Sequence, residues 1–321
     1  MKNSSHYQIF RTAVVWSASL FVLGVALGSV HGAALKDSYN VPVDQVLTLE
    51  DAKWKKWKIE GPDSQPLVYQ RGGGEEDSGE APKVISEGSL QYRDAKGVAL
   101  PSVGNRLLNA GEEKSSVLLT YKLNLLDSSL AGGMLEPSAK QQENAERSQA
   151  GWGAPNQTVW FSVLLQPNGG VLAISLRNSA YSTGPNGIQF SADPKKGQLI
   201  IKQDWPTLWK VEESSAKVEI DPGSPTWLVA KIETGPEWGS SNEYETICSG
   251  FGKMDEPLPK PTGRLTVWIN PLLGSAPDPA TASAAIPLHE MRINTIWLTL
   301  GAGAEIDELR LDPEFSALIA K

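Results

Sequence analysis

Cysteine and histidine are nearly absent from this sequence of 321 residues, which contains one cysteine and three histidines. The single Cys248 excludes an intramolecular disulfide, and the shortage of both residue types excludes a Cys/His zinc site. Beyond residue 32 the only histidine is His289, so a Cys248–His289 nucleophile and base pair has little support. The preferred interpretation of Cys248 is a partly buried structural residue.

Charged residues are scarce at the start of the chain, where Lys2 and Arg11 are the only ones before an apolar run over residues 13–30. Small and then polar residues follow this run. These are the features of a secretory signal peptide, which we place at residues 1–32 with cleavage after Gly32. A retained membrane anchor is the alternative, because the run is long enough to span a bilayer. Both interpretations predict an exported protein that is periplasmic, cell-surface or extracellular. If the leader is removed, no stable membrane span is expected to remain.

Clustered positive charge is lacking as well. The chain has 29 basic and 37 acidic residues, and without the leader the formal charge becomes −10. Binding to nucleic acid needs clustered Lys and Arg on the protein surface, so nucleic acid is not expected as a partner. The excess of acidic residues is interpreted as a contribution to solubility.

Long helical periodicity is missing, whereas 30 glycines and 22 prolines separate short runs of β-branched and aromatic residues. This pattern is typical of all-β proteins. The strongest hairpin candidate has arms on either side of Pro167-Asn168-Gly169-Gly170, because Asn-Gly suits the positive φ angles of a tight turn. Strands are expected within residues 84–94, 115–126, 157–178, 187–204, 210–220, 226–234, 263–271, 291–301 and 304–312, and long loops within 71–82, 128–156, 236–263 and 271–287.

Many strands without helices to cover them imply two sheets packed face to face. We therefore predict an all-β, two-sheet antiparallel jelly-roll sandwich with long loops. In residues 226–234 both alternating faces are partly apolar, which suits a strand near the middle of a sheet. The predicted organisation is one sandwich domain at residues 84–316, an N-terminal extension at 33–83 that packs on it with an edge strand, and a tail at 317–321.

Four segments resemble, in order and spacing, the closing strands of laminin-G-like, concanavalin-A-like lectin and glucanase jelly-roll domains of exported bacterial proteins. These segments are Leu228–Ile232, Leu265–Pro271, Arg292-Ile293 and Ile306–Leu311. The resemblance covers most of residues 84–316 and implies a concanavalin-A-like sandwich. It implies no single activity, because that fold carries lectins, glucanases and structural modules.

Acidic residues gather on the last expected strand, in Glu305-Ile306-Asp307-Glu308. The glucanases of the resembling fold carry Glu-x-Asp-x-Glu on a mid-chain strand, with all three acids on one face of the cleft. Here Leu309 stands where the last acid is needed, and the segment lies at the end of the chain. We therefore assign no catalytic residue and interpret the segment as a closing strand with an exposed acid-rich face.

Tryptophan is abundant, with eleven residues. Sugars bind aromatic platforms because indole offers a wide apolar face and one donor. Trp205, Trp209 and Trp238 stand in turns or polar segments and are the candidate ligand-binding residues. The alternative is that they cap the open ends of the sandwich. The tryptophans on expected strands are placed in the core by default: Trp160, Trp227, Trp268 and Trp297.

The sequence thus predicts an exported, non-catalytic binding or surface-structural module, whose partner would be a polysaccharide or an envelope or matrix component. The alternative is a glycoside hydrolase or lyase on the same fold with an unrecognised acid pair. No cofactor or metal ligand is assigned. Calcium stays open because it is common on this fold, although no loop has dense Asp/Asn ligand spacing.

Overall fold

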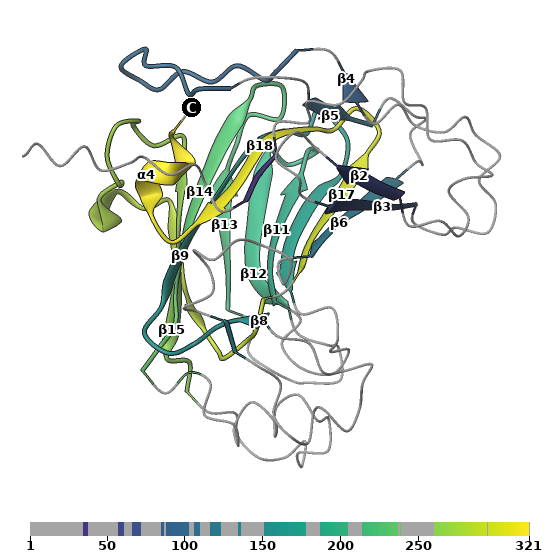
Figure 1. Cartoon of the computed structure of the whole chain (residues 1–321). Coiled ribbons are helices and arrows are strands. Elements are labelled where there is room, and N and C mark those ends of the chain that lie inside the picture. The colour runs from purple at the N-terminus through teal and green to yellow at the C-terminus, as the bar shows by residue number, and fades with distance from the viewer. Residues whose placement is uncertain are drawn as a thin grey trace, which may run out of the picture.

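Two antiparallel sheets pack face to face in the computed structural model (Figure 1). The structure describes residues 35–37, 57–60, 66–71, 85–86, 88–102, 106–109, 116–122, 134–135, 151–177, 187–204, 214–236, 238, 260–293 and 295–320. Of several short strands, the backbone alone is described. Among the described residues, no helix is long and apolar enough to cross a membrane.

The first sheet, sheet A, has the strand order β16-β15-β14-β9-β18-β5-β4, with β1 also paired to β18. In that order its strands are Ala284–Leu288, Gly263–Ile269, Thr226–Glu233, Thr158–Gln166, Glu305–Asp312, Arg106–Leu108 and Ile85–Ser86, and β1 is Leu35–Asp37. The last long strand, β18, therefore lies inside the sheet between β9 and β5. This confirms the prediction that residues 304–312 form the closing strand.

The second sheet, sheet B, has the order β13-β12-β11-β10-β17-β6-β3-β2. In that order its strands are Ser215–Glu219, Gln198–Asp204, Gly187–Asp193, Leu172–Arg177, Thr295–Gly301, Ser116–Lys122, Pro66–Arg71 and Trp57–Glu60. A separate pair joins β7 (Met134–Leu135) to β8 (Gly151–Trp152). The expected all-β, two-sheet antiparallel sandwich is confirmed. β2 lies at the margin of sheet B.

Alternating side chains from both sheets form the main core between them. In β14, Leu228, Ala230 and Ile232 point into this core, as the alternation in the sequence predicted. On β10 the inward residues Leu172, Ile174 and Leu176 are fully buried, whereas Ala173 and Ser175 are half-buried. Period-2 burial of this kind means that one face of β10 lies in the core and the other face is less buried.

A second apolar layer covers the opposite face of sheet A. Trp227 and Val229 of β14 point into it, together with Trp160 of β9 and Trp268 of β15. The covering segments are residues 88–102, the loop after β15 and the short helix α4 (Phe315–Leu318), which Figure 1 shows against the outer side of sheet A. Sheet A is therefore buried on both faces.

The expected hairpin over residues 157–178 is wrong. Its turn forms as predicted, because Asn168 and Gly169 have φ angles of 50° and 91° and Gly170 N–H donates to the Pro167 carbonyl. However, β9 pairs with β14 and β18 in sheet A, while β10 pairs with β11 and β17 in sheet B. The turn thus carries the chain from one sheet to the other. The long buried β9 suits the doubly covered sheet A, and the alternating β10 suits sheet B.

Two further expectations differ from the structure. In the segment 84–94, expected to be a strand, only residues 85–86 are a strand, and residues 88–94 instead lie over sheet A as part of its outer layer. The segment 271–287, expected to be a loop, contains β16 at the edge of sheet A. Whether a segment covers an apolar sheet face, as residues 88–94 do, or joins the edge of a sheet, as β16 does, depends on tertiary packing. Local alternation of residue types does not encode this packing.

Asp94 ties together two parts of this outer layer. Its Oδ1 accepts backbone N–H groups of Lys96 and Val98 at 2.9 Å each, and its Oδ2 accepts the N–H of Leu273 at 2.9 Å. These hydrogen bonds, first that from Leu273, hold the pKa of Asp94 below its ordinary value. The neighbouring Tyr92 hydroxyl donates to the Pro271 carbonyl at 3.1 Å, and burial raises the pKa of Tyr92 to about 12.

We expect Asp94→Asn to destabilise the protein in a pH-dependent manner. A carboxyl group whose pKa is lower in the folded state than in the unfolded state stabilises the fold at pH values above its unfolded pKa, which is about 3.9 for Asp. This stabilisation is lost as the pH falls through the pKa of the folded state. The variant should therefore have a lower free energy of unfolding at pH 7, and the gap to the wild type should narrow towards pH 3. Urea unfolding at several pH values measures this, with the exposed Glu219→Gln as the charge-matched control. If the difference in free energy of unfolding between the wild type and Asp94→Asn stayed constant from pH 7 to pH 3, the stabilising role of the Asp94 carboxylate would be contradicted.

Candidate functional site

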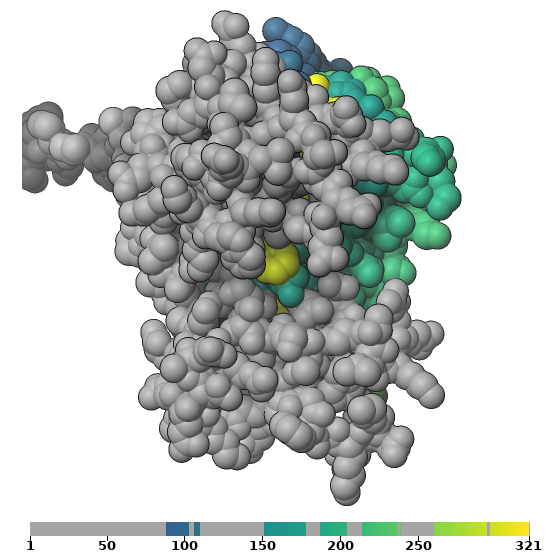
Figure 2. Space-filling view, turned by 90° about the vertical axis from the view of Figure 1, so that its right-hand side faces the viewer, coloured from purple at the N-terminus to yellow at the C-terminus, as the bar shows by residue number. Residues whose placement is uncertain are grey.

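The outer face of sheet B differs from the other sheet faces. In the part of the chain that the structure describes, apolar clusters cover both faces of sheet A but only the inner face of sheet B. On the outer face of β10, β11, β12 and β17 the described side chains are half-buried, and on β13 they are exposed. Figure 2 looks onto the side of sheet B, where yellow atoms from the end of the chain and teal atoms from its middle reach the surface near the centre. This outer face is the candidate site.

Strand register sorts the outward positions into three rows that cross the sheet, here called the central, second and third rows. The central row, from β2 to β13, is Lys58, Val68, Thr120, Trp297, Ser175, Gln189, Lys202 and Ser215. The second row, from β3 to β13, is Gln70, Leu118, Thr299, Ala173, Ser191, Ile200 and Lys217. The third row, from β6 to β12, is Lys122, Thr295, Arg177, Gly187 and Asp204.

Arg177 and Trp297 form the centre of this face. They lie on the adjacent strands β10 and β17, and the Arg177 guanidinium carbon is 3.9 Å from the centroid of the Trp297 ring. At this distance the cation is attracted to the ring face. A guanidinium that stacks by its plane still directs its N–H donors along its edges. The pair therefore combines apolar ring surface with polar donors at one spot.

The expectation that Trp297 belongs to the core is wrong. Its neighbours Ile296 and Leu298 point inward and are fully buried, so alternation turns Trp297 outward, where it is half-buried. The sequence did contain the signal, because threonines alternate with Trp297 in Thr295–Gly301 while aliphatic residues occupy the other positions. The other strand tryptophans are buried as predicted: Trp160, Trp227 and Trp268.

The three tryptophans predicted as ligand-binding residues have different outcomes. Trp205 and Trp209 lie outside the described residues, in the connection from β12 to β13, and remain predictions. Trp238 is 2% exposed, and its Nε1 donates to the Met291 carbonyl at 2.9 Å. It is therefore a packing residue at one end of the main core, so its ring is not offered to a ligand and we remove it from the candidate set.

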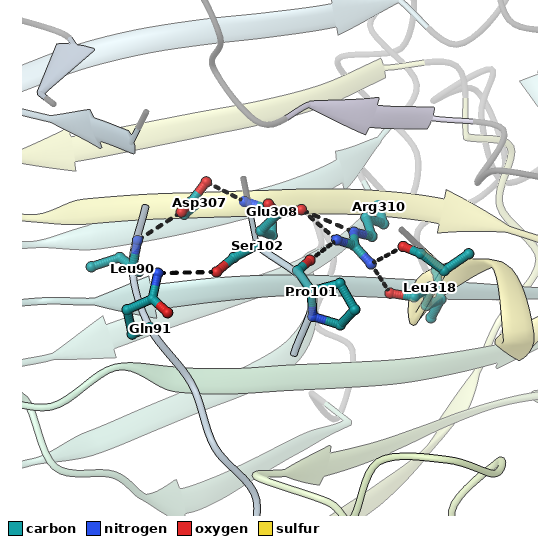
Figure 3. A network of polar contacts seen from close by, with 9 residues as sticks. Leu90, Gln91, Pro101, Ser102, Asp307, Glu308, Arg310 and Leu318 are labelled. Carbon is teal, nitrogen blue, oxygen red and sulfur yellow. Dashed lines mark hydrogen bonds and ion pairs between the residues drawn. The ribbon is translucent and has the colours of Figure 1, made fainter. Parts of the chain in front are cut away.

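The acidic residues of β18 are not exposed, so the expected acid-rich surface is wrong (Figure 3). Asp307 and Glu308 are both fully buried. Asp307 Oδ2 accepts the backbone N–H of Leu90, and its Oδ1 accepts that of Glu308, each at 2.8 Å. Glu305 is half-buried, forms an ion pair with Arg106 and accepts a hydrogen bond from Asn168 Nδ2 at 2.9 Å. These acids belong to sheet A rather than to the outer face of sheet B.

A β-bulge explains this burial. The pairing of β18 with β9 shifts between Asp307 and Arg310, and Glu308 has a φ angle of 49°. The extra residue keeps both Ile306 and Leu309 in the main core although they are three positions apart. Arg310 consequently points away from the main core, where it pairs with Glu308 at 2.5 Å.

Arg310 also joins the outer layer to the sheet (Figure 3). Its Nη1 donates to the carbonyls of Leu318 and Ala320, and its Nη2 donates to the carbonyl of Pro101 at 2.5 Å. Arg310 and Glu308 have no exposed side-chain surface. The ion pair is thus a structural element that fixes α4 and residues 100–102 against β18.

Gly187 allows β11 to approach β10 beside Arg177. Its φ angle is 135°, and a Cβ placed there would lie 1.8 Å from the Leu176 carbonyl oxygen. We expect Gly187→Ala to lower the free energy of unfolding by more than about 1 kcal/mol, because both conformation and space forbid the methyl group. Gly169→Ala is the control, since Gly169 also has a positive φ but nothing within 4 Å of the added Cβ. If Gly187→Ala and Gly169→Ala lowered the free energy of unfolding by the same amount in urea, the steric explanation would be contradicted.

Metal ligation finds no support among the described residues, where no group of three or more His, Cys, Asp or Glu side chains is suited to hold an ion. Asp278, one acid of the loop after β15, accepts the N–H of Ala280 at 2.8 Å and begins the short 3-10 helix Pro279–Thr281. Its position is thus explained by the local turn.

No protein-family model matches this sequence, and no curated protein matches it. The similar solved structures include carbohydrate-binding module CBM66 from Bacillus subtilis (5% identity, 72% of this chain and 96% of that chain, TM-score 0.31). They also include the galectin LEC-6 from Caenorhabditis elegans (9% identity, 56% and 96%, TM-score 0.28) and winged bean acidic lectin (10% identity, 71% and 92%, TM-score 0.25). At these low values the similarities carry no argument about function, and the fold assignment rests on the chain's own two sheets.

Proposed function

We propose that this chain is an exported, non-catalytic carbohydrate-binding module that binds polysaccharide on the outer face of sheet B. The observation that carries the proposal is the Arg177–Trp297 pair, 3.9 Å apart, on a sheet face without an apolar cover in the described part of the chain. Export is inferred from the composition of residues 1–32.

The chemistry of the face suits a sugar. An indole ring packs against the C–H groups of a sugar ring, and polar groups at its edges bind the hydroxyls. Ser175 and Gln189 are the next members of the central row after Trp297. Their donors and acceptors, with the guanidinium of Arg177, supply the few oriented polar groups that a ligand site needs. Ala173 and Ser191, which are paired in the second row, have small side chains.

The positions of the acidic residues of β18 disfavour a catalytic function. In the described part of the chain, Asp307 and Glu308 are buried under the outer layer of sheet A and engaged in hydrogen bonds. Glycoside hydrolysis needs two carboxyl groups facing each other across the bound sugar. Two further pairs of adjacent acidic residues, Glu212-Glu213 and Asp255-Glu256, lie outside the described residues. Hydrolysis is therefore kept as an outcome of the experiment.

The test measures binding of the chain from Ala33 onward to a panel of insoluble and soluble polysaccharides, with product release assayed in the same wells. We expect binding without product release. Trp297→Ala should weaken it at least about 30-fold, as removal of a central aromatic contact residue costs about 2 kcal/mol or more. Arg177→Gln should weaken it as well. Val171→Ala, at an exposed position outside the rows, is the matched control.

Circular dichroism and thermal unfolding of each variant separate lost binding from lost folding. Binding that survives Trp297→Ala but disappears with Trp205→Ala or Trp209→Ala would move the site to the connection between β12 and β13. Release of sugar products would overturn the non-catalytic assignment. No binding to any polysaccharide would overturn the proposal.

A further inference from the structure

Three exposed asparagines of the described residues have a left-handed backbone conformation. Asn156, Asn168 and Asn270 have φ angles of 55°, 50° and 53°. Each stands in a turn or bend, where asparagine tolerates this conformation. The three differ in the residue that follows, and the backbone nitrogen of that residue determines whether the asparagine side chain can react with its own backbone.

The reaction in question is deamidation, to which asparagine is prone. The backbone nitrogen of the following residue attacks the side-chain carbon Cγ and closes a succinimide ring. The side-chain nitrogen leaves as ammonia and takes the proton of the attacking N–H. Water then opens the ring at either carbonyl, which gives aspartate or isoaspartate. The attacking nitrogen must therefore carry a proton, be free of other hydrogen bonds and not be shielded by a side chain.

Two of the three asparagines do not meet these conditions. Asn270 is followed by Pro271, and a proline nitrogen carries no proton. Asn156 is followed by Gln157, whose N–H donates to Thr234 Oγ1 at 2.8 Å. The side chain of Gln157 also stands beside its own backbone nitrogen. Both asparagines are therefore expected to be stable.

Asn168 meets all of the conditions. Gly169, which follows it, is exposed, and a Cβ added there would have nothing within 4 Å. The N–H of Asn168 donates to the Pro222 carbonyl, and that of Gly170 donates to the Pro167 carbonyl. Within the described part of the chain, the N–H of Gly169 donates no hydrogen bond. We infer that Asn168 is a site of spontaneous deamidation.

Two hydrogen bonds hold the Asn168 amide. Gln166 Nε2 donates to Asn168 Oδ1 at 2.8 Å, and Asn168 Nδ2 donates to Glu305 Oε1 at 2.9 Å. The first bond favours the reaction, because Oδ1 gains negative charge when Cγ is attacked. Both bonds also restrain the side chain. The folded protein should therefore react more slowly at Asn168 than the unfolded chain does.

The product changes the contact with Glu305. Deamidation replaces Asn168 Nδ2, a donor 2.9 Å from Glu305 Oε1, with a carboxylate oxygen. Two carboxylates this close repel each other when both are ionised. Isoaspartate also lengthens the backbone by one carbon atom, in the turn that carries the chain from β9 in sheet A to β10 in sheet B. Deamidation should thus weaken the connection between the sheets as the protein ages.

The test incubates the folded chain from Ala33 onward at pH 6 and at pH 9 and locates converted residues by mass spectrometry of its peptides. We expect conversion of Asn168, faster at pH 9 because the deprotonated amide attacks, and little conversion of Asn156 or Asn270. Labelling with protein isoaspartyl methyltransferase identifies the isoaspartate product. The same chain unfolded in urea should convert faster and serves as the positive control for detection.

Two variants test the cause and the consequence. Gly169→Ala should slow the conversion of Asn168 at least about tenfold, because the methyl group shields the attacking nitrogen and so raises the activation free energy. Asn168→Asp imitates one product and should unfold at a lower urea concentration than the wild type at pH 7. This difference should shrink towards pH 3, where the carboxyl groups become protonated. Val171→Ala, at an exposed residue beside the same turn, is the matched control.

Several results would overturn the inference. Conversion of Asn156 or Asn270 to the same extent as Asn168 would show that the N–H of Gly169 does not select the site. Equal rates in the wild type and Gly169→Ala would show the same. The sequence has one other Asn-Gly pair, at residues 186–187, whose asparagine lies outside the described residues. Conversion at that pair alone, or no conversion in the folded protein, would remove Asn168 as a deamidation site.

Discussion

Replacing Arg310 with methionine is expected to destabilise the protein by about 3–5 kcal/mol, the loss typical of removing one partner from a buried ion pair. Glu308 would remain fully buried and would lose its ion pair with Arg310. The carbonyls of Pro101, Leu318 and Ala320 would lose the donors that hold them. Since a domain is stable by only about 5–15 kcal/mol, this single change should bring the chain close to unfolding.

A double-mutant cycle tests the explanation. Glu308→Gln/Arg310→Met should be more stable than Arg310→Met alone, because the second change removes the buried carboxylate that has lost its ion pair with Arg310. Urea unfolding of the four proteins gives the coupling free energy. Arg264→Met, at an exposed arginine of β15, is the matched control and should change little. If the double variant were less stable than Arg310→Met, the buried charge would not be the source of the loss.

Replacing Trp227 with alanine is expected to cost about 3–5 kcal/mol, the range for large aromatic residues truncated in a core. Trp227 is fully buried in the layer outside sheet A, with its ring centroid 5.6 Å from that of Tyr92 and 6.5 Å from that of Phe315. The cavity would lie between β14 and the segments that cover it. Thermal or urea unfolding measures the loss.

Trp227→Phe is the informative control. Among the described residues, Trp227 Nε1 has no hydrogen-bond partner, so phenylalanine loses ring volume without breaking a hydrogen bond. It should retain most of the stability. Polysaccharide binding by folded Trp227→Phe should equal that of the wild type, because β14 belongs to sheet A. A loss below about 1 kcal/mol in Trp227→Ala would indicate that the outer layer contributes little to cooperative folding.

Much of the fold follows from alternation in single strands. Residues 226–234 correctly predicted Trp227 on one face and Leu228 on the other, and the same reasoning holds for Val267 and Trp268 of β15. Alternation does not reveal which strands pair. The Asn168-Gly169 turn was therefore predicted correctly while the sheet assignment of its two arms was not.

The misassigned polar residues have a shared physical cause. Burial of Asp307 and Glu308 depends on a bulge at a non-glycine residue with positive φ, and on a covering segment more than two hundred positions away in the sequence. Trp238 is buried by packing against Gly263 and Met291, which a local reading of a polar loop does not foresee. Only Trp297 could have been found, since its threonine neighbours already indicated an outward face.

The position of the last two strands constrains how the chain can fold. β17 fills the gap between β6 and β10, and β18 fills the gap between β5 and β9, so both sheets are completed from the C-terminal side. The pairing of Leu35 with Leu311 joins segments from opposite ends of the sequence. Such non-local topology folds slowly, because long loops must close before contacts form. Until residues 295–312 emerge, four central strands keep open edges, a state prone to aggregation.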